Sequence, residues 1–181
     1  MKTITVKYQI YKFKELNREA KDLAIANWYA KEDYPFFNED LKESCRCLLD
    51  QYKIKYNDDL SLGYSLSYSQ GDGLNFQGTF KWKNTDIKIS HTWRYPFAEA
   101  SYITMYDKNG DEIISKSARI EQIDDYNKFI NKFIKIYLHI CNELEKEGYE
   151  ELAYRMDDKE FAEHCETNGY NFFKDGRMAN L

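Results

Sequence analysis

The residues with the clearest potential for recognition chemistry lie in the pentapeptide Ser69-Gln70-Gly71-Asp72-Gly73, which separates two runs of alternating apolar residues. Two glycines permit positive φ, and Asp72 between them can close a turn, so a structural role is sufficient to explain the segment. A polar loop at the end of a sheet can also present backbone and carboxamide groups to a partner. It is not a phosphate-binding loop, because no helix start and no lysine follow it in the required order. We therefore predict a partner-binding site at Ser69, Gln70, Gly71, Asp72, Gly73 and Asn75.

The three histidines do not have the spacing of a metal site. His91, His139 and His164 are far apart and form no H-E-x-x-H or H-x-x-x-H arrangement. His139 falls beside a helical apolar stripe and His91 belongs to a strand alternation, so both are predicted to be structural. His164 is next to Cys165, but adjacent helical side chains diverge by about 100°, which disfavours a pair of base and thiol. We expect no metal site and no cofactor.

Other potential catalytic residues also lack the arrangement that catalysis requires. No serine lies in a G-x-S-x-G elbow, and acid pairs such as Asp58-Asp59 fall where loops or helix starts place solvated acids. Trp93-Arg94-Tyr95 could form a stacking platform, but Trp93 continues a strand alternation, which predicts core packing. The cysteines show neither a C-x-x-C pair nor a secretory context, which predicts reduced, buried thiols. They are Cys45, Cys47, Cys141 and Cys165. The sequence favours a binding protein, with an enzyme as the weaker alternative.

Composition and charge limit the classes of partner. The chain has 181 residues, of which 43% are hydrophobic, with a formal net charge of −5 and an aromatic load of 16 Tyr and 11 Phe. Nucleic-acid-binding proteins usually carry a basic footprint, so direct binding of duplex DNA is not expected. Residues 143–166 hold ten acidic side chains against three basic ones. This stretch could meet a basic partner, although a solvated helix face also explains it.

No apolar run at the start of the chain precedes a small-residue cleavage site, and no stretch approaches the roughly 18 apolar residues that a membrane span needs. We expect a cytoplasmic protein that makes no membrane contact. The length fits one domain covering residues 1–181.

The first third of the chain predicts a strand and two helices. Residues 4–10 alternate between apolar and polar, with the period of two of a half-buried strand. Asn17 is a predicted N-cap for the first helix. A second helix is expected to begin near Pro35. Its predicted inward stripe contains Phe37, Leu41, Cys45, Leu48, Leu49 and Tyr52.

The middle of the chain predicts a meander of four or five strands, to which the first strand would be added. Alternation returns over 60–68, 74–82, 87–93, 102–106 and 112–114, and the Asn109-Gly110 pair predicts a hairpin. A long helix follows over 123–144, with Gly148 expected to break it before a short helix that reaches Met156. Asp157 with Glu160 resembles a capping box, and 170–177 resembles a last strand and turn. The predicted fold is therefore α+β, an antiparallel sheet covered by helices in the order strand, helix, helix, four or five strands, helices, strand.

Two segments resemble a known family. Residues 13–24, Phe-Lys-Glu-Leu-Asn-Arg-Glu-Ala-Lys-Asp-Leu-Ala, and residues 68–76, Tyr-Ser-Gln-Gly-Asp-Gly-Leu-Asn-Phe, are similar to small proteins of phages and mobile elements of Gram-positive bacteria. The ending from Tyr170 to Gly176 resembles that family as well. Within this neighbourhood, length and motifs are similar to type II-A anti-CRISPR proteins, which inhibit Cas9. Other members are described as antitoxin-like.

The resemblance implies a function that the residues alone do not give. It implies an anti-CRISPR protein that binds Cas9 loaded with guide RNA, in the cytoplasm of a bacterial host cell. An antitoxin that neutralises a cognate toxin is the second hypothesis. A metal-dependent nuclease that uses Asp72 and neighbouring acids is the third.

Overall fold

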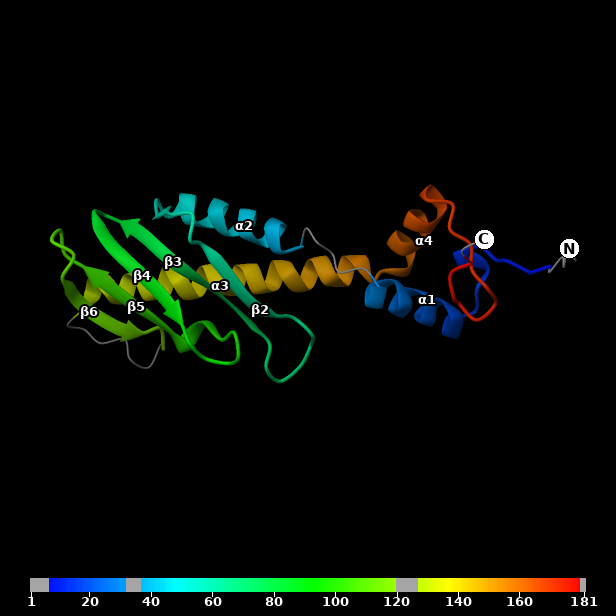
Figure 1. Cartoon of the computed structure of the whole chain (residues 1–181), viewed down its shortest axis with the longest axis horizontal. Helices are drawn as coiled ribbons and strands as arrows, with labels where there is room; N and C mark the ends of the chain where they lie inside the picture. Colours follow the sequence, from blue (N-terminus) through cyan, green and yellow to red (C-terminus); the bar gives the residue numbers. More distant parts are fainter. Residues whose placement is uncertain (1–6, 32–36, 120–126, 180–181) are drawn as a thin grey trace, which may run out of the picture. The chain divides into compact units, whose positions relative to one another are not determined.

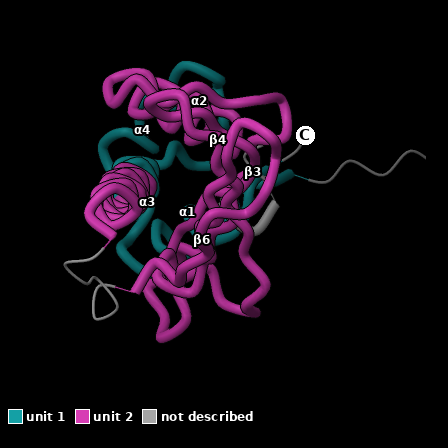
Figure 2. Tube along the Cα trace, turned by 90° about the vertical axis from the view of Figure 1, so that its left-hand side faces the viewer, with its two compact units in different colours: residues 1–34, 150–181 teal, residues 35–149 magenta. Residues whose placement is uncertain are grey.

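The computed structural model describes residues 7–31, 37–119 and 127–179. The chain divides into two compact units (Figure 2). The smaller unit contains residues 1–34 and 150–181, and the larger unit contains residues 35–149. Each unit has its own cluster of buried apolar side chains. That residues 1–181 form a single domain stays a prediction.

The larger unit is built on an antiparallel sheet. Six strands are present in the described part of this unit: β1 (Lys55–Tyr56), β2 (Ser61–Ser65), β3 (Gly73–Trp82), β4 (Thr85–His91), β5 (Ser101–Tyr106) and β6 (Glu112–Ser117). Strands β3 to β6 form a meander in chain order, and β1 and β2 both pair with β3. The predicted α+β fold with an antiparallel meander is confirmed.

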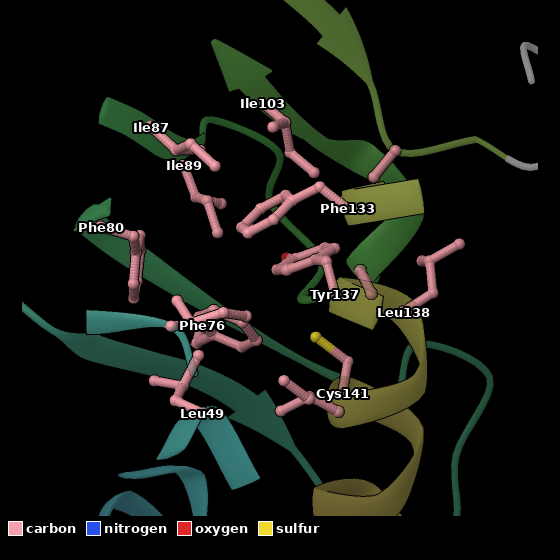
Figure 3. Close-up of a cluster of buried hydrophobic side chains, with 14 of the residues drawn as sticks. Leu49, Phe76, Phe80, Ile87, Ile89, Ile103, Phe133, Tyr137, Leu138 and Cys141 are labelled. Carbon is pink, nitrogen blue, oxygen red and sulfur yellow. The ribbon is translucent and has the colours of Figure 1, made fainter. Parts of the chain in front are cut away.

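Alternation along the strands sends one set of side chains into the core. Successive strand residues point to opposite faces, and the inward set from β3 to β5 includes Phe76, Phe80, Ile87, Ile89 and Ile103. These side chains meet Phe133, Tyr137 and Cys141 of helix α3 (Lys128–Arg155), as Figure 3 shows. These side chains form the centre of the core of the larger unit.

Two helices supply the rest of this core. In Figures 1 and 2, α3 lies along one side of the sheet, and α2 (Phe37–Gln51) lies beside the strands. The predicted stripe of α2 is confirmed, with Leu41, Cys45 and Leu49 buried and the others partly buried. The first residues predicted for the long helix, Ile123 and Tyr126, lie outside the described residues. No helix in the described part of the chain is long and apolar enough to cross a membrane.

The prediction that Gly148 breaks the long helix is wrong. Helix α3 continues through Gly148 to Arg155 as one element of 28 residues. A Cβ at position 148 would collide with Cδ1 of Leu66, and Phe37 and Leu41 lie next to the same point. The glycine therefore permits close packing against the helix, and this benefit outweighs its low helix propensity of about 1 kcal/mol relative to alanine.

The smaller unit contains α1 (Arg18–Lys31) and α4 (Asp158–Thr167). The predicted N-cap of α1 is confirmed, because the Ala20 N–H donates to Oδ1 of Asn17 at 2.9 Å. Asp157 caps α4 by accepting from the backbone N–H groups of Lys159 and Glu160. The Glu160 side chain accepts a hydrogen bond from the Tyr154 hydroxyl, so the reciprocal half of the predicted box is not the contact that forms.

The strand predicted over residues 4–10 is wrong where it can be tested. Residues 7–10 are exposed and belong to no strand, whereas residues 4–6 lie outside the described part. The chain instead makes an isolated bridge from Tyr11 to Phe172, and Phe172 makes another to Met178. The predicted last strand is thus reduced to single bridges. Alternation alone was not sufficient, because no strand among the described residues pairs with residues 7–10 to cover one face.

Candidate functional site

The loop between β2 and β3 is organised around the carboxylate of Asp72. Its Oδ2 accepts hydrogen bonds from the backbone N–H groups of Ser67 (2.7 Å) and Ser69 (3.0 Å) and from the Tyr149 hydroxyl (2.6 Å). Its Oδ1 accepts from the hydroxyls of Ser65, Ser67 and Ser69 at 2.9, 2.9 and 3.1 Å. Both oxygens are therefore fully used inside the protein.

This arrangement fixes the ionised form of Asp72. Partial burial opposes ionisation, but the hydrogen bonds from Tyr149 and from the serines of the loop outweigh burial and hold the pKa of Asp72 well below its usual range. Burial, together with the hydrogen bond to Asp72, raises the pKa of Tyr149 to about 12. A carboxylate held this way is a poor general base, because its lone pairs are occupied and its proton affinity is low. Asp72 therefore has a structural role at the centre of the loop.

The two glycines of the loop do not have the positive φ that the sequence analysis considered. Neither Gly71 nor Gly73 has positive φ, and the residue in the left-handed region is Tyr68, with φ 56°. A Cβ at Gly71 would lie 3.0 Å from the Tyr95 ring, and one at Gly73 would lie 3.1 Å from the carbonyl oxygen of Pro96. The glycines therefore let the segment 93–97 pack closely against the loop.

A cleft of about 400 Å³ lies where the loop meets this segment. Gly63 and Ser65 of β2, Asn75 and Gln77 of β3, His91 of β4, and the segment 93–96 line it, together with Ser69 and Gly71 of the loop. Of the predicted partner-binding residues, Ser69, Gly71 and Asn75 line the cleft. Gln70 is exposed beside them, Asp72 is turned inward, and Gly73 is buried.

The predicted core position of Trp93 is wrong. Strand β4 ends at His91, and Trp93 is 60% exposed. Tyr95 and Phe97 are also exposed, and their ring centroids are 5.9 Å apart. The sequence pattern did not predict that these aromatic residues lie on the surface. The available signal was Pro96, which cannot donate to a strand ladder and is typical of the end of a strand.

His91 holds the segment 93–97 to the sheet. Its Nε2 lies 2.9 Å from the Tyr95 carbonyl oxygen, and its Nδ1 lies 3.0 Å from Ser101 Oγ. A carbonyl can only accept, so Nε2 carries the proton and, in the neutral ring, Nδ1 accepts from Ser101. Ser101 in turn accepts from the Tyr137 hydroxyl at 2.7 Å. Because Ser101 is completely buried, this pair of serine and histidine has a structural role.

Asn75 is a buried polar residue at the floor of the cleft. It is 1% exposed, and its Oδ1 has no hydrogen-bond partner among the described residues. Asn75 pairs with Gly63 across β2 and β3, and a Cβ at Gly63 would lie 3.0 Å from Nδ2 and 3.3 Å from Oδ1. The Asn75 amide therefore occupies the space that a side chain at position 63 would fill.

The remaining reactive groups are dispersed. Cys45, Cys141 and Cys165 are buried as predicted, and burial raises the pKa of Cys45 and Cys165 to about 12 and that of Cys141 further. The prediction is wrong for Cys47, which is exposed. Among the described residues, no group of three or more His, Cys, Asp and Glu side chains is arranged to hold a metal ion.

Comparison of the chain with protein-family models, with curated proteins and with solved structures gave no match.

Proposed function

We propose that this chain is an inhibitory binding protein that contacts its target through the loop surface, defined as residues 68–73 and 93–97, and that the target is Cas9 loaded with guide RNA. The observation that carries the binding role is the group of exposed aromatic side chains on this surface. Tyr68 is 68% exposed and Trp93 is 60% exposed. Arg94, which lies within 5.7 Å of the Tyr95 ring centroid, is exposed as well.

The composition of the loop surface matches that of protein interfaces. Trp, Tyr and Arg are the residues that most often dominate binding energy, and they do so where water is excluded from well-packed pockets. Here they surround a ready-made cleft. The fold buries many other aromatic rings. Large rings that stay exposed to water therefore favour a role in contact with a partner over a role in core packing.

The loop surface is also rigid before binding. Asp72 ties Ser65, Ser67 and Ser69 together, and the Tyr149 hydroxyl ties the loop to α3. A preformed surface loses less conformational entropy on association, which increases affinity.

The identity of the target rests on the family resemblance of residues 13–24 and 68–76. The second of these segments supplies residues 68–73 of the loop surface. A net charge of −5 suits a basic nuclease as partner. Electrostatic attraction of this kind acts mainly on association, so added salt should slow association more than it speeds dissociation.

The test is cleavage of target DNA by a panel of type II-A Cas9 proteins, each loaded with guide RNA, with and without the purified protein. Trp93→Ala should weaken binding and inhibition by about tenfold or more, as for an aromatic hot spot. Ile113→Ala on β6 is the matched control, because Ile113 is 61% exposed and lies outside the loop surface. Gln70→Ala tests the loop itself without removing the hydrogen bonds of Asp72.

Two results would count against the proposal. Full inhibition by folded Trp93→Ala and Gln70→Ala variants would remove the loop surface from the contact. Absence of Cas9 binding across the panel would reject the target, and binding to a co-encoded toxin would favour the antitoxin hypothesis.

A further inference from the structure

The cleft has the features of a ligand site in its own right. Its volume of about 400 Å³ falls at the lower end of the range of about 300–1,000 Å³ that is typical of small-molecule sites. Its walls combine the aromatic residues Trp93 and Tyr95 with polar groups from β2 and β3. All of these residues belong to the larger unit.

The floor of the cleft requires a hydrogen-bond donor. Asn75 is 1% exposed and its Oδ1 is unpartnered among the described residues, an arrangement that is unfavourable unless a donor reaches it. A Cβ at Gly63 would lie 3.0 Å from Nδ2 and 3.3 Å from Oδ1, so the amide itself occupies the space beside this glycine. A ligand N–H that reached Oδ1 would satisfy it.

The charges of the cleft select against a cation. Arg94 and His91 are the basic side chains of its lining, and none of the lining residues is Asp or Glu. The nearby carboxylate of Asp72 does not line the cleft, and its oxygens are occupied by the loop. A cationic group would therefore be desolvated without a counter-charge, whereas an anionic group could pair with Arg94.

A ligand that matches these features has a planar aromatic group, an N–H donor and a negative charge. An aromatic base stacks on Trp and Tyr faces, an asparagine amide pairs with the amino-bearing edge of adenine, and arginine pairs with phosphate. From these three features together, we infer that the cleft binds one unpaired nucleotide whose base carries an exocyclic amino group. The nucleotide is either free or part of a single-stranded RNA.

This inference goes beyond the proposed function, because it concerns a ligand of the free protein and does not require Cas9. It also agrees with the acidic net charge, because one nucleotide needs one cationic contact and not a basic track along a polyanion. Since Oδ1 is buried in the empty cleft, the side chains that cover it must move before a base can reach the amide.

The test is titration of the full chain, by calorimetry and by NMR chemical shifts, with adenosine monophosphate and inosine monophosphate. Inosine carries an oxygen where adenine carries its amino group. Adenosine monophosphate should bind saturably, and inosine monophosphate should bind about tenfold more weakly or worse, as expected for the loss of a base-specific pair. Adenosine without phosphate tests Arg94, and a short single-stranded oligoadenylate distinguishes RNA from free nucleotide by binding more tightly than the monophosphate.

Variants assign the binding to the cleft. Asn75→Leu should abolish the preference for adenosine over inosine monophosphate, Trp93→Ala should weaken both, and Ile113→Ala should change neither. Equal affinity of the wild-type protein for the two monophosphates would overturn the inference, as would the absence of saturable binding by both the monophosphate and the oligoadenylate. The ligand comparison uses the unaltered protein, so a variant that fails to fold does not affect it. Because Cas9 is absent, the outcome is separate from that of the proposed function.

Discussion

Replacing Phe133 by alanine tests which side of α3 faces the sheet. Phe133 is completely buried, and its ring centroid lies 5.5 Å from that of Trp82. Phe129 lies one turn earlier on the same helix and also contacts Trp82, at 4.9 Å, but it is 40% exposed. The two residues thus offer the same chemical change in the same helix at different depths.

The magnitude follows from burial. Deleting a fully buried phenylalanine leaves a cavity as well as lost transfer free energy, so Phe133→Ala should lower the free energy of unfolding by about 3–5 kcal/mol. At roughly 2–4 °C per kcal/mol for a chain of this size, the Tm should fall by about 6–20 °C. Phe129→Ala should cost about 1 kcal/mol, because much of its ring is already in water.

Urea denaturation followed by circular dichroism measures both values. The midpoint should move while the slope stays constant, which separates a change in stability from a change in the unfolded state. A loss below about 1 kcal/mol for Phe133→Ala, or equal losses for the two variants, would mean that the buried stripe of α3 is assigned to the wrong residues.

Three further outcomes are expected. Gly176 has φ +88° and a Cβ there would collide with the Ala20 carbonyl, whereas Gly110 has φ +87° in open space. In the same urea experiment, Gly176→Ala should therefore lower the free energy of unfolding by more than about 2 kcal/mol. Gly110→Ala should lower it by only about 1–2 kcal/mol, which is the cost of a left-handed backbone conformation for alanine. The pKa of Asp72 is lower in the folded protein than its unfolded value of about 3.9. The ionised carboxylate therefore stabilises the folded state at pH values above the unfolded pKa, and this stabilisation is lost as the pH falls below it. The Tm difference between wild type and Asp72→Asn should thus be constant from about pH 7 to 5 and shrink towards about pH 2; a difference that grows in acid would contradict the loop geometry. In the native protein, a thiol reagent should modify Cys47 rapidly and the three buried cysteines only on unfolding, and rapid modification of two or more thiols would show that the core opens readily.

Local patterns determined much of this fold. The apolar stripes of α2 and α3, the alternation of β3 and β4, and the caps at Asn17 and Asp157 each depend on residues within a few positions of one another. Propensity, periodicity and capping act over that range, so the elements and the α+β class could be predicted from the sequence. The polar pentapeptide 69–73 could also be identified as a turn with unusual residues.

The tertiary structure decided what those residues contact. Gly148 lies inside a helix because Leu66 approaches it, and Gly71 and Gly73 are needed because Tyr95 and Pro96 lie against them. Each of these contacts joins segments that are far apart in the sequence or in different elements.

The same reason explains the errors at the ends of strands and in the candidate site. Trp93 is exposed although it continues an alternating pattern, because strand β4 ends at His91. Residues 7–10 alternate, but no strand in the described part of the chain lies next to them. The unpartnered Oδ1 of Asn75 became apparent only when Gly63 and the segment 93–96 were placed around it. A sequence specifies which side chains tend to be buried, whereas pairing between distant segments decides which polar groups are left without a partner.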